Sequence, residues 1–148
     1  MLNPFDDQYF MKKALQEAEI ALREGEVPVG AVIVCNNQIV AKGHNQVETL
    51  NDATAHAEMV AFTAATNYLG AKYLKNCTLY VTLEPCQMCA GAAFWAQIGK
   101  IVYGASDDKR GYQHLHCQVH PKTEVVSGIM AQESEELLEM FFAQMRKK

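Results

Sequence analysis

The chain has 148 residues, of which 49% are hydrophobic and 20% are charged, and its formal net charge is −4. This length and composition predict a single domain over residues 1–148 that buries a core of its own, and they exclude a disordered chain. The acidic balance also argues against a strongly basic protein that holds nucleic acid without regard to sequence.

The N-terminal stretch MLNPFDDQYF has no cationic segment leading into an apolar run, and no apolar stretch of the chain approaches membrane-spanning length. We therefore expect a cytoplasmic protein that does not bind membranes. Asn3 and Pro4, with Asp6 and Asp7 in the following turn, predict the start of a helix, and Gly25 predicts its end.

Two apolar runs follow, PVGAVIVC at 28–35 and QIVAKG at 38–43, on either side of Asn36 and Asn37. An Asn-Asn pair between two such runs predicts a β-hairpin with a two-residue turn. These two strands should therefore be adjacent and antiparallel.

Helices and strands alternate between residues 57 and 105. A helix is predicted from Ala57 to a stop at Gly70, with its apolar face at Val60, Ala61, Ala64, Ala65 and Tyr68. The later elements are strands at 77–83, 100–105 and 123–128, an apolar helix at 86–97 and an amphipathic C-terminal helix marked by Leu137, Leu138, Phe141, Phe142 and Met145. Together these elements predict an α/β fold with a five-stranded sheet covered by helices.

Two short motifs place potential metal ligands at the starts of two predicted helices. TAHAEM carries His56 and Glu58, and PCQMC carries Cys86 and Cys89. Cysteines at i and i+3 share one helix face, and the positive end of the helix dipole stabilises their thiolates. One histidine and two thiolates form a three-ligand zinc set of the catalytic kind, which keeps a fourth position for water. Glu58 is then placed to act as the base.

The spacing of His56 and Glu58 imposes a condition on the backbone. Residues i and i+2 of a regular helix point to nearly opposite sides. Both side chains can serve one site only if His56 precedes regular helical geometry, which the capping residues Asp52 and Thr54 permit.

Other uses of the cysteines and histidines are less favoured. Five cysteines, an odd number, fit a disulfide framework poorly. A thioredoxin-like redox pair at CQMC lacks the preceding aromatic residue of such sites. A structural zinc site needs a fourth ligand, for which the candidates are Cys35, Cys77, His44 and Cys117. A second metal site is an alternative for the loop HLHCQVH, with candidate ligands His114, His116, Cys117 and His120.

HAE followed by PCQMC matches the HxE and PCxxC signature of the zinc-dependent nucleobase deaminases. The stretches EVPVGAVIV, HNQVETLNDATAHAEM, CTLYVTLEPCQMCAGA, IVYGASDDKRG and LLEMFFAQMRKK resemble the bacterial tRNA-specific adenosine deaminase family. The resemblance implies a cytidine-deaminase-like fold of three layers, α/β/α, around a five-stranded mixed sheet. It also implies that the fifth strand runs parallel to the fourth.

The same resemblance implies conversion of the wobble adenosine of an arginine tRNA anticodon to inosine, with release of ammonia. In that family the enzyme is a homodimer, and both subunits contribute to the RNA surface. The match implies that His56, Cys86 and Cys89 hold one zinc ion per subunit and that Glu58 moves protons.

The resemblance also indicates substrate contacts. Asn45 matches the base-recognising asparagine of the family, and its amide offers both a donor and an acceptor to a base or a ribose edge. Asp107 and Lys109 match family positions that contact the anticodon nucleotides.

The segment 111–122, GYQHLHCQVHPK, departs from the family pattern, because the Gly-Ser-Leu element that members carry in this loop is absent. Tyr112 and the histidines of this loop suit stacking on bases, and a smaller substrate is the alternative. Two further functions therefore stay open. One is deamination of free guanine, cytosine or a cytidine nucleotide such as dCMP, and the other is a zinc-stabilised RNA-binding module without turnover.

Overall fold

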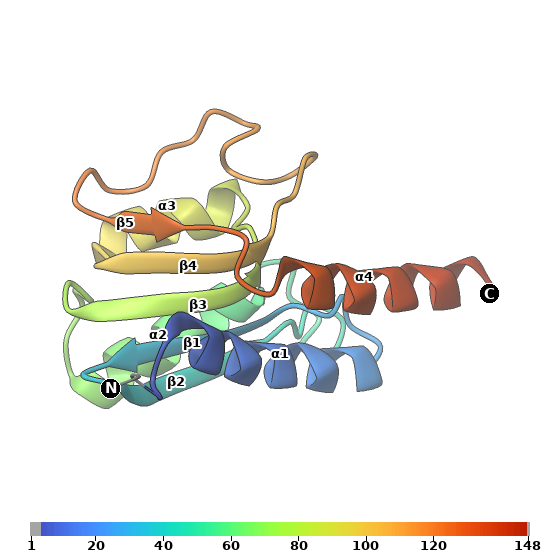
Figure 1. Cartoon of the computed structure of the whole chain (residues 1–148), viewed down its shortest axis with the longest axis horizontal. Coiled ribbons are helices and arrows are strands. Elements are labelled where there is room, and N and C mark those ends of the chain that lie inside the picture. Colours follow the sequence, from blue (N-terminus) through green and yellow to red (C-terminus); the bar gives the residue numbers. More distant parts are fainter. Residues whose placement is uncertain (1–3, 148) are drawn as a thin grey trace.

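The computed structural model describes residues 4–147. Figure 1 shows the helices and strands that these residues form. The elements are α1 (Asp7–Arg23), β1 (Gly30–Cys35), β2 (Gln38–His44), α2 (Ala57–Leu69), β3 (Cys77–Leu83), α3 (Gln87–Ala96), β4 (Lys100–Ala105), β5 (Glu124–Val126) and α4 (Ala131–Arg146). None of the helices in this part of the chain has the length and the apolar character that crossing a membrane requires.

The N-terminal helix begins later than predicted. Asn3 lies outside the described residues, and Pro4 precedes the helix. Asp6 is the N-cap of α1, because its backbone is extended and its side chain accepts a hydrogen bond of 2.8 Å from the Tyr9 N–H. The predicted start was therefore wrong, since the acceptor that satisfies the first free N–H groups is Asp6. The predicted stop is confirmed by Gly25, whose φ of 78° ends the helix.

The five strands form one sheet in the order β2-β1-β3-β4-β5. β1 and β2 form the predicted antiparallel hairpin, and Asn36 and Asn37 adopt φ values of 53° and 61°, as this two-residue turn requires. β1 is antiparallel to β3, whereas β3, β4 and β5 run parallel to one another. The sheet is therefore mixed, and the parallel orientation of the fifth strand is confirmed.

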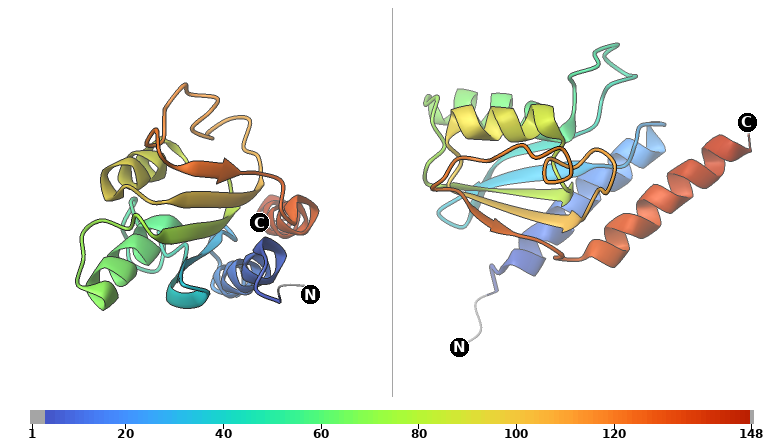
Figure 2. Two further views of the ribbon diagram at one scale, coloured as in Figure 1. Left: turned by 60° about the vertical axis from the view of Figure 1, so that its left-hand side comes forward. Right: turned by 90° about the horizontal axis from the view of Figure 1, so that it is seen from above.

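Two helices cover each face of this sheet (Figure 2). α1 and α4 lie on one face, where the ring of Phe10 packs 5.2 Å from that of Tyr80. α2 and α3 lie on the other face, where Ala61 and Ala93 are buried against Leu79. Because neighbouring residues of a strand point to opposite faces, Leu79 and Tyr80 anchor the two cores. The predicted three-layer α/β/α fold is confirmed.

The predicted apolar faces of two helices are only partly buried. Ala65 is the last buried residue of α2, and Tyr68 in the following turn is 73% exposed. In α4, Phe141 is buried, whereas Phe142 and Met145 are 48% and 50% exposed. Tyr68, Phe142 and Met145 therefore belong to the predicted apolar faces but lie largely in solvent.

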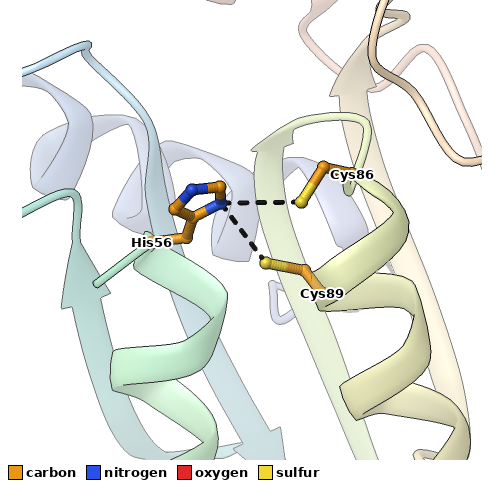
Figure 3. A group of neighbouring side chains, drawn as sticks. All are labelled: His56, Cys86 and Cys89. Carbon is orange, nitrogen blue, oxygen red and sulfur yellow. Dashed lines mark hydrogen bonds between the residues drawn. The ribbon is translucent and has the colours of Figure 1, made fainter. Parts of the chain in front are cut away.

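The starts of α2 and α3 lie side by side (Figure 3). α3 begins shortly after β3, with residues 84–86 between them, whereas α2 begins after the longer segment 45–56 that follows β2. Gly43 of β2 permits the close packing of α2, because a β-carbon there would lie 3.0 Å from the backbone nitrogen of Ala61. The topology therefore brings the HAE and PCQMC motifs next to each other.

Candidate metal centre

His56 is the N-cap of α2 and has an extended backbone, with φ −73° and ψ 153°. It precedes helical geometry, so the condition that the HxE spacing imposes is met. The residues before it are held by Asp52, whose Oδ1 accepts hydrogen bonds of 2.8 Å from both the N–H and the hydroxyl of Thr54. Asp52 and Thr54, the two residues expected to permit this start of the helix, therefore fix the backbone that leads into it.

Cys86 and Cys89 approach His56 from the start of α3 (Figure 3). Cys86 is the N-cap of that helix and also has an extended backbone, whereas Cys89 lies in the first turn. Each Sγ lies 3.6 Å from His56 Nδ1, and the three ligand atoms lie within 4.8 Å of one another. One imidazole nitrogen and two sulfurs at these separations fit a tetrahedral zinc ion, whose bonds to such ligands are about 2.0–2.3 Å long.

The two cysteines differ in their tendency to ionise. A hydrogen bond from Cys89 lowers the pKa of Cys86 to about 4, against the cost of burial and with the help of His56. The same hydrogen bond, together with burial, raises the pKa of Cys89. A second thiolate beside the first is therefore costly unless a cation lies between them. A divalent metal ion meets this condition, because it deprotonates the thiols that coordinate it.

Glu58 lies in the first turn of α2, and its side chain is 4% exposed. Burial is the main cause that raises the pKa of its carboxyl group to about 7, and the neighbouring Cys86 acts in the same direction. The carboxyl group also hydrogen-bonds with Cys89, although it is not part of the ligand group. Glu58 is thus a buried acid beside the potential ligands, which is the position of a group that exchanges protons with a bound substrate.

The alternatives that need more ligands are not supported. Among residues 4–147, His56, Cys86 and Cys89 form the one group of metal-ligating side chains close enough to share an ion. The candidates for a fourth ligand do not join it: Cys35, Cys77, His44 and Cys117. The histidines of the loop 114–120 likewise form no second group in this part of the chain. Three ligands are the number that catalytic zinc sites use, and the group is compatible with one zinc ion.

Asn45 directly follows β2, and its side chain is hydrogen-bonded to the first residue of α2. Its Oδ1 accepts a hydrogen bond of 2.8 Å from the N–H of Ala57, and its own N–H donates to the Val29 carbonyl at 3.1 Å. The first bond holds the side chain at Ala57, the residue after His56, and the second holds the backbone of Asn45. The Nδ2 group makes no hydrogen bond to any described residue, so it is the part of the amide that can donate to a ligand.

Asp107 and Lys109 lie on the loop after β4. Asp107 is half-buried, and its Oδ1 accepts hydrogen bonds from the N–H groups of Lys109 and Arg110, at 3.1 and 3.0 Å. The side chains of Lys109 and Arg110 are exposed. Tyr112, in contrast, is 6% exposed and packs in the core beneath α2 and α3. The prediction that Tyr112 stacks on bases was therefore wrong.

Two buried carboxylates, Glu26 and Glu84, were missed in the sequence. Glu26 is 2% exposed and accepts hydrogen bonds from the Glu48 N–H and from the N–H and hydroxyl of Thr49. Burial acts to raise the pKa of Glu26, but these hydrogen bonds outweigh it and hold the pKa below its ordinary value. Glu84 is 6% exposed and accepts two backbone hydrogen bonds from the loop after β4. The available signal was position: each acid adjoins an apolar strand and is followed within two residues by a proline.

Known proteins resemble this chain over most of its length. Residues 4–105 match the family profile of the cytidine and deoxycytidylate deaminase zinc-binding region. The chain is 43% identical to the tRNA-specific adenosine deaminase of Bacillus subtilis (strain 168), over 96% of this chain and 92% of that protein.

Solved structures also share the fold. One, from work on A-to-I editing by tRNA:A34 deaminases at the wobble position of transfer RNA, has a TM-score of 0.80 and 41% identity, and the match covers 88% of this chain and 99% of the other. The structure of guanine deaminase from Bacillus subtilis has a TM-score of 0.63 and 40% identity, with 72% of this chain and 66% of that chain covered.

Proposed function

The chain belongs to the tRNA-specific adenosine deaminases of the cytidine and deoxycytidylate deaminase family, and we propose that it converts adenosine to inosine at the wobble position of a tRNA anticodon. The observation that carries this proposal is the group of His56, Cys86 and Cys89 with the buried Glu58 beside it. The Bacillus subtilis relative and the structure of the A34 deaminase support tRNA as the substrate. Because tRNA is used in the cytoplasm, we place the protein there.

In this proposal His56, Cys86 and Cys89 hold one zinc ion per chain. When bound, zinc supplies hydroxide at neutral pH, because it lowers the pKa of a water molecule to about 7. The protein positions these ligands rigidly, since two of them cap helices whose first turns are fixed by the fold.

Glu58 carries the protons. Its carboxylate accepts the proton that water gives up during attack on C6 of adenine and delivers it to the adjacent ring nitrogen, N1. It then takes the second proton from the oxygen added at C6 and passes it to the departing amine, so that water and adenosine yield inosine and ammonia. The burial of Glu58 keeps bulk water from competing for these transfers.

Asn45, Asp107 and Lys109 are the proposed substrate contacts. Asn45 presents its Nδ2 group next to His56, so it can donate to the base or the ribose of the reacting nucleotide. Lys109 is exposed on a loop whose Gly111 forms a backbone bridge with Cys86. A cationic side chain at that position suits the phosphates of a neighbouring nucleotide.

Deamination of a free base is the second candidate function. It is favoured by the 40% identity with guanine deaminase from Bacillus subtilis and by the absence of the Gly-Ser-Leu element from the loop 111–122. An assay with both classes of substrate separates the two candidates.

The substrate assay compares an RNA hairpin carrying an anticodon loop with adenosine at the wobble position against free adenine, guanine, cytosine and dCMP. We expect ammonia release from the hairpin alone. The matched control is the same hairpin with guanosine at the wobble position, which should be inert. Release from a free base together with an inert adenosine hairpin would assign the second function instead.

We also propose that two copies of the chain associate through the layer formed by α2 and α3. Tyr68 and Trp95 are 73% and 79% exposed there, and Phe94 lies beside Trp95 with ring centroids 6.1 Å apart. Large aromatic side chains gathered on one face are typical of protein interfaces. The resemblance to a family of homodimers supports a second copy as the partner.

Trp95→Glu is expected to convert the dimer into a monomer, because it places a charge in an apolar contact. Molar mass by light scattering after gel filtration measures this. Phe142→Glu is the matched control, since Phe142 is exposed on α4 at the opposite face of the sheet and should leave the dimer intact. A monomeric unmodified protein, or a dimeric Trp95→Glu variant, contradicts the proposed interface.

A further inference from the structure

We propose that Glu84 is a positioning residue for substrate recognition, acting through the loop 106–113. Its buried carboxylate fixes the conformation of this loop, which carries Lys109. It also holds the loop next to the segment that supplies Cys86. The inference rests on the proposed function, since it names a residue that prepares the same site for its RNA substrate.

The carboxylate of Glu84 is buried without a cation. Its side chain is 6% exposed, and it forms no ion pair with any described residue. Each oxygen instead accepts one backbone hydrogen bond: Oε1 from Asp107 at 3.0 Å and Oε2 from Gln113 at 3.1 Å. Hydrogen bonds to a charged acceptor are stronger than neutral ones, and a buried carboxylate depends on them. One side chain thus binds both ends of the loop.

The loop is wound closely around this carboxylate. The Gly111 N–H donates to the Asp107 carbonyl at 3.0 Å, and the side chain of Asp107 accepts from the N–H groups of Lys109 and Arg110. Gly111 passes so near that a β-carbon there would lie 2.5 Å from Glu84 Oε2. No side chain fits between the loop and the carboxylate, so Glu84 and Gly111 together define where the loop lies.

The same segment that holds the loop also supplies a metal ligand. The Glu84 N–H donates to the Ala105 carbonyl at 2.8 Å, and the Pro85 carbonyl accepts from the Tyr112 N–H at 2.9 Å. Gly111 forms a backbone bridge with Cys86 itself. The backbone of the loop that carries Lys109 is therefore held near the potential zinc ligands by its contacts with residues 84–86.

Glu84→Gln tests this role with little change in shape. A glutamine keeps one oxygen, so its amide group faces one of the two backbone N–H groups, and two donors then oppose each other in a buried place. We expect that end of the loop to move away from the metal centre. The loop binds substrate in this proposal, whereas the zinc ligands and Glu58 are untouched.

The expected result is a rise in KM for the anticodon hairpin of roughly 10- to 100-fold, with kcat changed less than about threefold. Zinc content should stay at that of the unmodified protein. A general loss of folded protein would instead lower kcat and zinc together, so the split between KM and kcat separates positioning from mere stability.

Coupling to Lys109 makes the test sharper. If Glu84 acts by placing Lys109, then Lys109→Ala should cost less in the Glu84→Gln background than in the unmodified protein. Glu26→Gln is the matched control, because Glu26 is an equally buried carboxylate that holds the other loop through Glu48 and Thr49. Glu26→Gln and Lys109→Ala should act independently, so the factor by which Lys109→Ala raises KM should be the same in the Glu26→Gln background as in the unmodified protein.

Gly111→Ala is the second variant. Its added β-carbon would clash with the Glu84 carboxylate and displace the loop without changing any charge. It should show the same rise in KM and the same coupling to Lys109→Ala. An unchanged KM in Glu84→Gln, independent effects with Lys109→Ala, or loss of zinc and folded protein in both variants would overturn the inference. Failure of the unmodified protein to deaminate the hairpin would instead overturn the proposed function.

Discussion

Glu58→Gln is expected to reduce deamination of the anticodon hairpin by about 10²–10⁴-fold, the usual contribution of a general acid–base group, while the protein keeps its zinc. The amide has nearly the shape of the carboxylate, so the first turn of α2 remains packed. It can neither accept the proton of the attacking water nor deliver one to the ring nitrogen. Chemistry is therefore lost without loss of the metal centre.

The measurement is the initial rate of inosine formation together with the metal content of the same sample. Glu19→Gln is the control, because Glu19 is exposed on α1 and a change there should leave both quantities unaltered. An active Glu58→Gln variant would remove Glu58 from the reaction. Zinc lost together with activity would show that Glu58 serves to hold the metal.

Cys86→Ala and Cys89→Ala are each expected to lower bound zinc well below one ion per chain and to bring deamination to the background rate. Either substitution leaves two protein ligands, and two ligands do not complete the set that catalytic zinc sites use. The cavity left by sulfur also cannot be filled by another ligand, since no further metal-ligating group of the described residues belongs to this site.

Metal analysis after dialysis against a chelator checks this expectation. Cys117→Ala is the matched control, because Cys117 is a free cysteine outside the ligand group and its loss should leave zinc unchanged. Full zinc occupancy in both Cys86→Ala and Cys89→Ala would overturn the ligand assignment, whatever the activity of the variants.

Much of the fold could be predicted from the sequence, because the signals were local. Asn36 and Asn37 between two apolar runs determine the hairpin, and the HxE spacing requires an extended backbone at His56, which the structure has. The site could be predicted for the same reason. His56 and Cys86 each cap a helix, and the order of the strands brings the two helix starts together.

The remaining features depend on contacts between distant residues. Tyr112 lies in a loop, where an exposed side chain is expected, but its backbone N–H donates to the Pro85 carbonyl and its ring enters the core. The partners of Glu26 and Glu84 are N–H groups more than twenty residues further along the chain, so the position of each acid beside a strand does not show which loop it binds. Periodicity likewise says which face of α2 is apolar, but not where the sheet ends beneath it, and Tyr68 lies past that point.

The most direct test of this account is mass-spectrometric sequencing of the anticodon of tRNA that has been incubated with the protein. We predict inosine in place of adenosine at the wobble position, and unmodified adenosine after incubation with the Glu58→Gln variant. An anticodon that keeps its adenosine with the unmodified, zinc-loaded protein would contradict the central claim.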